Sequence, residues 1–226
     1  MATLGTYVFD DRHTSVTDTV DEVAGRTRRA FVVSGLIVGK ATTDDIESEL
    51  DAIADAASEG RWVTFSIRSG RQVVVERTEF ARRLDAGERV GSFTLRLAAA
   101  EPFEESSTVT EVPWSVTASG DTKQVATGGD VFSEPRIELA ASGNVVNPAF
   151  SDGTRTIQYW GTVATGETLV FDAAGRTVTL EAEDVMAYTT GEFPRVSPEG
   201  CTLTYTDDQS SSHIASVTVS FRDRWW

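Results

Sequence analysis

The chain has 226 residues, of which 40% are hydrophobic, and its formal net charge is −15. This length fits one large β domain or two domains of about 100 residues each, and no apolar run approaches the roughly 20 residues of a membrane-spanning helix. The acidic excess argues against non-specific nucleic-acid binding, which needs a basic surface.

The charged residues are unevenly chosen. Eighteen arginines accompany only two lysines, Lys40 and Lys123, against 35 acidic residues. An acidic surface keeps a protein soluble by self-repulsion, and abundant acids with almost no lysine favour a halophilic source. Cys201 is the only cysteine, so no internal disulfide and no cysteine-based metal site is expected. The N-terminus shows neither the basic nor the apolar region of a secretory signal.

The first 30 residues carry little periodicity. Residues 7–9 are expected to form a short strand, and residues 10–21 show no clear pattern. Residues 25–29 place three arginines in an otherwise acidic chain. We interpret this basic patch as a solvated segment before a strand, with an interface to an acidic neighbour as the alternative.

A strand and a helix follow. Residues 30–39 are nearly all β-branched or apolar, which predicts a strand covered on both faces, and Gly35 inside it indicates a bulge or a close backbone approach. Residues 42–58 predict a helix, since apolar residues recur on one face at helical spacing. Thr42 and Asp45 have the spacing of a capping box.

The rest of the first half predicts a hairpin and one further strand. Residues 62–68 and 72–76 alternate around a Ser-Gly turn. We expect a charged link over residues 78–91 and a strand over residues 92–98. Residues 104–130 read as a connection that holds one strand with Trp114, at 112–116.

The second half reads as short runs of β-formers separated by glycine turns. Strands spaced by about 8–12 residues with turn signals between them are typical of an antiparallel sandwich or barrel. The predicted strands lie at residues 135–139, 156–160, 167–171, 176–180 and 216–222.

No catalytic motif is found. A Gly-x-Ser-x-Gly elbow is absent, and Gly128-Gly129 precedes neither Lys-Ser/Thr nor a helix, so no phosphate loop is expected. Cys201 could meet His13 or His213 in space, but no motif joins them. The acidic helix face of Asp44, Glu47, Ser48, Asp51 and Asp55 is interpreted as solvated. We predict no enzyme, and no catalytic, cofactor-binding or metal-binding residue.

Sugar binding is the alternative function. Six aromatic residues supply candidate ring surfaces: Tyr159, Trp160, Phe171, Tyr188, Phe193 and Tyr205. Neighbours in a strand point to opposite faces, so at most one of Tyr159 and Trp160 lies outward and the other belongs to the core. The simpler interpretation is that alternate members of this set fill the core.

Several segments, in order and spacing, carry a family resemblance. They are residues 29–39, the predicted helix, 93–103, 129–138, Asn147-Pro148 with 149–151, 156–161, 165–172, 191–194, 197–200 and 221–226. Together they resemble the distal tail protein of long non-contractile-tailed (siphovirus-like) phages and archaeal tailed viruses. With the acidic composition, the resemblance suggests a haloarchaeal virus.

The resemblance implies a mainly β protein of two domains. Residues 1–127 would be an N-terminal β-sandwich with one helix at about 43–58, which forms a ring. Residues 128–226 would be a C-terminal galectin-like antiparallel β-sandwich. The implied function is structural: a hexameric ring at the distal end of the virion tail tube, assembled in the host cytoplasm. Its implied partners are further copies of itself, the tail tube protein, the tape measure protein, and the tail hub and fibre proteins, with no specific nucleic-acid binding and no membrane insertion.

Overall fold

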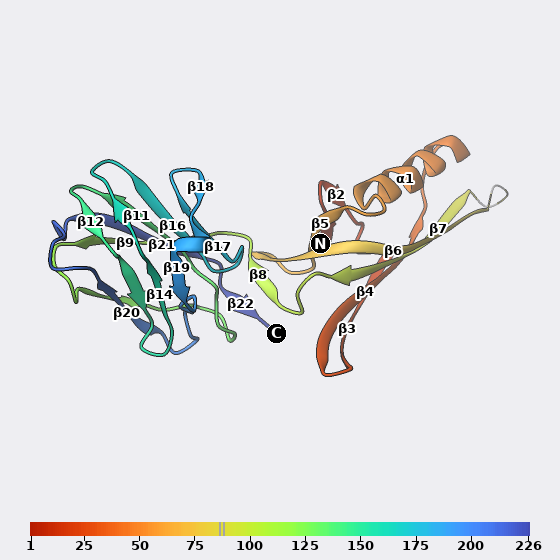
Figure 1. Cartoon of the computed structure of the whole chain (residues 1–226). Coiled ribbons are helices and arrows are strands. Elements are labelled where there is room, and N and C mark those ends of the chain that lie inside the picture. Colours follow the sequence, from red (N-terminus) through yellow and green to blue (C-terminus); the bar gives the residue numbers. More distant parts are fainter. Residues whose placement is uncertain (86, 88) are drawn as a thin grey trace. The chain divides into compact units, whose positions relative to one another are not determined.

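The computed structural model describes residues 1–85, 87 and 89–226. The chain divides into two compact units, one of residues 1–107 with Trp226 and one of residues 108–225. Within the described residues the structure is mainly β with a single α-helix, which confirms the predicted fold class (Figure 1).

The first unit is an antiparallel sheet with the helix α1 (Thr43–Ala56) against it. The strands follow the order β2-β1-β5-β6-β7-β4-β3, and β8 pairs with the beginning of β6. Their bounds are β1 (Thr3–Leu4), β2 (Tyr7–Val8), β3 (Thr14–Val23), β4 (Arg26–Ile37), β5 (Trp62–Ser66), β6 (Arg71–Asp85), β7 (Val90–Ala99) and β8 (Glu104–Ser106).

Local sequence explains the helix. The Asp45 backbone N–H donates to the Thr42 hydroxyl at 3.1 Å and the Thr42 N–H donates to the Asp45 carboxylate at 3.0 Å, which confirms the predicted capping box. The buried residues Ile46, Leu50 and Ile53 form the stripe that packs on the sheet. The helix ends at Ala56, two residues before the predicted end at residue 58.

The predicted strand at residues 30–39 is β4, but the prediction that both of its faces are covered is wrong for this chain. Phe31 and Val33 are fully buried, whereas Leu36 is exposed. The close approach predicted at Gly35 is confirmed, because a Cβ there would lie 2.8 Å from the Phe93 ring. The apolar run therefore reports one buried face and one open face.

Two further expectations in this unit need correction. Residues 10–21, which carry no clear period, contain most of β3, whose register runs from Thr14 opposite Gly35 to Val23 opposite Arg26. Alternation is missing because β3 buries neither face. The expected link at residues 78–91 is largely strand as well, since β6 extends to Asp85 and β7 begins at Val90; residues 86 and 88 lie outside the described residues.

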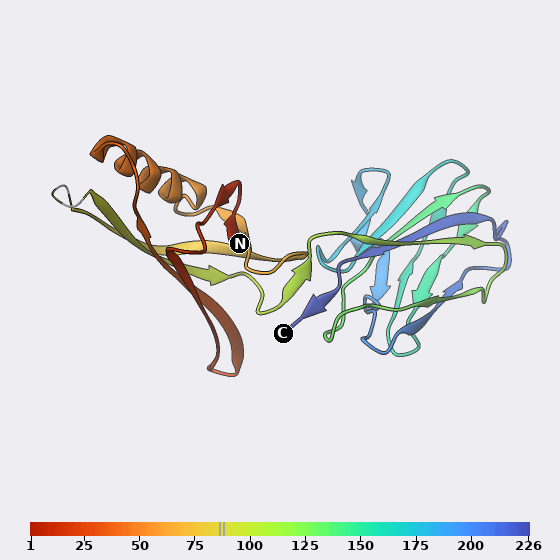
Figure 2. The same ribbon diagram turned by 180° about the vertical axis from the view of Figure 1, so that it is seen from behind.

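The second unit is a sandwich of two antiparallel sheets (Figure 2). One sheet has the order β10-β20-β13-β14-β19, the other β18-β17-β16-β11-β21-β9, and β12 pairs with β15. The bounds are β9 (Thr110–Val116), β10 (Thr122–Val125), β11 (Arg136–Ala141), β12 (Val145–Val146), β13 (Ala149–Ser151), β14 (Thr156–Tyr159), β15 (Thr162–Val163), β16 (Thr168–Asp172), β17 (Thr177–Leu180), β18 (Glu183–Asp184), the 3-10 turn η1 (Met186–Tyr188), β19 (Thr189–Gly191), β20 (Cys201–Thr206), β21 (Ala215–Phe221) and β22 (Arg224–Trp225).

The strands predicted in this half correspond to β11, β14, β16, β17 and β21. The core between the sheets centres on Phe150, whose ring lies 5.6 Å from Phe171, 5.6 Å from Tyr205 and 6.1 Å from Trp114. Edge-to-face and tilted aromatic pairs of this kind add to the stability that burial gives.

The two units meet in sequence after Ser107, whereas the predicted boundary lies at 127/128. The strands β9 and β10 account for the difference. β9 pairs with β21 and β10 pairs with β20, so both complete the sheets of the second unit. Their partners lie about 80 to 110 residues further along the chain, and a pairing over that separation leaves no local pattern.

Candidate functional sites: an arginine-rimmed pocket and an exposed hairpin arm

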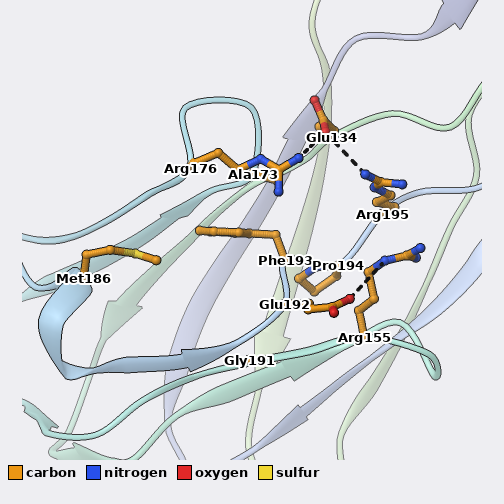
Figure 3. A pocket seen from close by; sticks show the side chains of 10 residues that line it. All are labelled: Glu134, Arg155, Ala173, Arg176, Met186, Gly191, Glu192, Phe193, Pro194 and Arg195. Atoms are coloured by element: carbon orange, nitrogen blue, oxygen red, sulfur yellow. Dashed lines mark hydrogen bonds and ion pairs between the residues drawn. The ribbon is translucent and has the colours of Figure 1, made fainter. Parts of the chain in front are cut away.

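A pocket of about 380 Å³ opens at the edge of the second unit, beside β17, η1 and β19 (Figure 3). Three arginines reach its rim from separate segments. Arg155 comes from the turn before β14, Arg176 from the turn before β17, and Arg195 from the segment after β19. In a chain with a net charge of −15, three guanidinium groups around one cavity form an unusual concentration of positive charge.

Two glutamates partly neutralise this rim. The Glu134 carboxylate lies 3.3 Å from Arg176 and 3.9 Å from Arg195, and Glu192 lies 3.7 Å from Arg155 (Figure 3). The contacts of Arg155 and Arg195 are longer than hydrogen bonds to carboxylates, which measure about 2.7–2.9 Å. The rim therefore keeps an excess of positive charge and guanidinium N–H groups directed toward the cavity.

The buried carboxylate of Asp152 holds the two segments that carry Arg155 and Arg195. It accepts hydrogen bonds from the backbone N–H of Thr154 at 2.8 Å, of Arg155 at 2.7 Å and of Arg195 at 2.8 Å. Burial alone would raise the pKa of Asp152, but these three N–H donors and the nearby Arg155 charge hold the pKa below its usual value. The pocket is thus fixed by a charged group below its rim.

The floor of the pocket is apolar. Phe193 is buried and Pro194 follows it, while Met186 lines the opposite side (Figure 3). The Arg195 guanidinium also stacks on the Phe132 ring, 4.2 Å from its centroid. Stacking orients the guanidinium plane and leaves its N–H edges available to a ligand.

A second candidate site is the arm, which we define as the exposed part of the β3–β4 hairpin, residues 17–28. Every residue of the arm is exposed, and in both views its closed end points away from α1 (Figures 1 and 2). A hollow of about 690 Å³ lies beside it, lined by residues that include Asp21, Arg26, Arg28 and Pro102. A two-stranded hairpin without a core of its own is marginally stable in water, so this arm is a candidate docking element.

The basic patch at residues 25–29 has two roles. Arg26 and Arg28 are exposed on the arm, but the Arg29 side chain is only 2% exposed. Arg29 donates to Asp18 at 2.5 Å and to the buried Glu104 at 3.1 Å, and its hydrogen bond to Asp18 is the main reason that its pKa is raised. Interpreting the whole patch as solvated is therefore wrong at Arg29, which is part of a buried ion-pair cluster.

The adjacent aromatic residues lie as predicted. Tyr159 is 7% exposed and belongs to the core, while Trp160 is 51% exposed and donates its indole N–H to the Thr190 hydroxyl at 2.7 Å. Tyr188 is 62% exposed. Of the other candidate sugar-binding rings, Phe171, Phe193 and Tyr205 are buried.

The remaining candidates form no catalytic or metal site in the part of the chain that the structure describes. His13 Nδ1 lies 3.0 Å from Asp10 and His213 Nδ1 lies 2.8 Å from Asp207, so both histidines contact a carboxylate rather than Cys201. Burial is the main cause that raises the pKa of the Cys201 thiol, which disfavours the thiolate.

The acidic face of α1 is solvated, as predicted. Asp44, Glu47 and Asp55 are exposed, and Asp51 forms an ion pair with Arg82. No helix among the described residues is long and apolar enough to cross a membrane.

The fold and the matched domain define a class of protein: a component of a siphovirus-type virion tail. Residues 128–225, which lie within the second unit, match the family model described as siphovirus-type tail component, C-terminal domain. The comparison with curated protein sequences gives no match.

Two solved structures resemble the chain. One is the SPP1 Dit (gp 19.1) protein, described as a paradigm of the hub adsorption apparatus in phages that infect Gram-positive bacteria. The likeness has a TM-score of 0.67 at 14% identity and covers 100% of this chain and 92% of that one, so the two share a fold. The other is a chain of the phage P2 baseplate in its activated conformation with calcium, with a TM-score of 0.40, 6% identity and coverage of 93% and 87%.

Proposed function

We propose that the chain is a distal tail protein that forms a closed ring at the distal end of a viral tail tube and joins the tube to the tail hub and fibres. One observation carries the proposal: residues 128–225 match a siphovirus-type tail component domain within a chain whose whole fold resembles the SPP1 Dit protein. No group suited to catalysis competes with this structural role among the described residues.

The arm supplies the physical argument for assembly. Its residues bury nothing within the single chain, and an exposed strand edge favours pairing with another chain. In a cyclic ring each interface joins two different surfaces of neighbouring copies. We infer that the arm of one copy lies on the next copy, where Arg26 and Arg28 meet the acidic face of α1.

The ring is proposed to be a hexamer made by the first unit. Its neighbours are proposed to be the tail tube protein, the tape measure protein, and the hub and fibre proteins, with assembly in the host cytoplasm. The second unit then serves as the adaptor toward the fibres. The source is proposed to be a haloarchaeal virus, on the strength of the acidic composition and the near absence of lysine.

The mass of the purified protein in solution tests the ring. Size-exclusion chromatography with light scattering in molar salt is expected to give a discrete oligomer with six times the mass of one chain. Negative-stain images are expected to show a ring with a central channel. A strict monomer in both low and molar salt, over a wide range of protein concentration, would overturn the proposal.

A carbohydrate-binding module used in host adsorption is the second candidate function. The exposed Trp160 and Tyr188 favour it, because stacking on aromatic rings is a common way to bind sugars. Replacing both residues with Ala and measuring adsorption of labelled protein to host cells tests this function. Unchanged adsorption would remove these two rings as its basis.

A further inference from the structure

The arginine-rimmed pocket of the second unit has no part in the proposed ring. We propose that it binds an anionic saccharide, a sugar ring that carries a carboxylate or a phosphate. The inference stands apart from the ring, because every residue that it uses belongs to the second unit.

The charge of the pocket selects an anion. Arg155, Arg176 and Arg195 face Glu134 and Glu192 across the cavity, which leaves one positive charge in excess (Figure 3). On a protein with a net charge of −15, that excess is a local exception. A cleft lined by one sign of charge concentrates ligands of the opposite sign.

The available hydrogen-bond donors select a carboxylate or a phosphate. Arg155 and Arg195 are each about one-third exposed, and their distances to Glu192 and Glu134 are 3.7 and 3.9 Å. A ligand oxygen at hydrogen-bond distance would replace these loose ion pairs with short ones. The planar guanidinium fork matches both carboxylate and phosphate groups in a bidentate way.

The floor and the size of the pocket select a sugar ring over a bare ion. Phe193, Pro194 and Met186 offer an apolar surface to the C–H face of a sugar, and a volume of about 380 Å³ is within the range of small-molecule sites. Gly191 lines the same pocket. It follows Thr190, which holds the exposed Trp160 ring, so an aromatic surface is available to further sugar units.

Calorimetric titration of the full-length protein tests the proposal. The probes are glucuronic acid, glucose 6-phosphate, glucose and inorganic phosphate. We expect at least one acidic sugar to bind saturably, and about tenfold more tightly than both glucose and inorganic phosphate. No saturable binding of either acidic sugar would overturn the proposal, and so would equal binding of glucose. Equal binding of inorganic phosphate would reduce the pocket to a simple anion site, and tighter binding of an oligoglutamate peptide would assign it to an acidic protein; both results overturn the saccharide.

Arginine variants locate the binding. Arg155→Gln and Arg195→Gln keep the backbone N–H bonds to Asp152, so they are expected to fold, and each is expected to weaken binding by about tenfold. Arg176→Gln, at the most exposed of the three, is the substitute if either fails to fold. Arg136→Gln, at an exposed arginine of β11 outside the pocket, is the matched control and is expected to bind normally. Loss in the control alone, or unchanged binding in all pocket variants, would overturn the assignment.

The mass of each sample in the same buffer separates the two proposals. Binding by a monomer would support the pocket and contradict the ring. A ring that binds no acidic sugar would do the reverse.

Discussion

At the scale of single residues, Asp152 shows how one side chain builds a site that no motif announces. Its side chain is 5% exposed, and its two oxygens accept the backbone N–H groups of residues far apart in the chain, Arg155 and Arg195. A buried carboxylate with several N–H donors stays charged because the donors replace its lost hydration. Asp152 therefore links the turn before β14 to the segment after β19.

Asp152→Asn is expected to lower the free energy of unfolding by about 1–3 kcal/mol at pH 7, because the amide accepts fewer hydrogen bonds and its NH₂ faces N–H donors. The folded pKa of Asp152 lies below its unfolded value of about 3.9. The stabilisation is therefore present above pH 4 and is lost as the pH falls through the folded pKa. Urea unfolding at pH 7 and at pH 3 measures it, and the gap between wild type and variant should shrink at pH 3.

Glu183→Gln, at an exposed carboxylate of the same unit, is the control for this experiment and is expected to change stability by less than about 0.5 kcal/mol. A gap between Asp152→Asn and wild type that is the same at both pH values would show that the Asp152 charge does not stabilise the turn.

At the scale of elements, the arm is the part of the structure that does not explain itself within one chain. Its inner end is tied down by Arg29, Asp18 and Glu104, while residues 17–28 pack against no core. The buried ion-pair cluster fixes where the arm leaves the sheet. The free portion then projects as a two-stranded element whose exposed valines, Val20 and Val23, are available to a neighbouring copy.

The double variant Val20→Asp, Val23→Asp is expected to reduce the ring to monomers, because it places carboxylates where apolar contact is proposed and adds repulsion to an acidic neighbour. Light scattering measures the mass. Circular dichroism should show an unchanged fold, since neither valine is buried. The control is Ile214→Asp, at an exposed apolar residue of the second unit; assembly is expected to survive it. A double variant that assembles as wild type does would show that the arm is not the interface.

At the scale of the whole molecule, the net charge of −15 acts on stability through self-repulsion. Salt screens this repulsion, because the Debye length falls from about 10 Å at 0.1 M to about 3 Å at 1 M. We expect the midpoint of thermal unfolding to rise between 0.1 and 2 M KCl. The triple variant Asp44→Asn, Glu47→Gln, Asp55→Asn on the solvated face of α1 should show a smaller rise. Equal midpoints of the wild type in both salts would contradict the halophilic source.

Much of the fold is accessible from local sequence. The helix α1 was predicted from its capping box and its apolar stripe, because both act within a few residues. The strands of the second unit were predicted for a related reason: half-buried strands alternate and turns need glycine. The opposite placement of Tyr159 and Trp160 follows from the same alternation.

The missed features have non-local causes. β3 lacks alternation because it buries neither face, and the second unit begins at residue 108 because β9 and β10 pair with β21 and β20. The candidate pocket was missed as well. The only available signal was that arginines are rare enough in this acidic half to be noticed one by one, and nothing in their spacing joins them.

The sequence by itself determined the class of fold, the single helix, the alternating strands and the family resemblance, because each depends on patterns that neighbouring residues create. Only the tertiary structure decided that residues 17–28 form an exposed arm, that Arg29 is buried and that three arginines share one pocket. Those outcomes depend on which strands pair across long separations and on where a buried carboxylate holds the chain, and composition and spacing do not encode either.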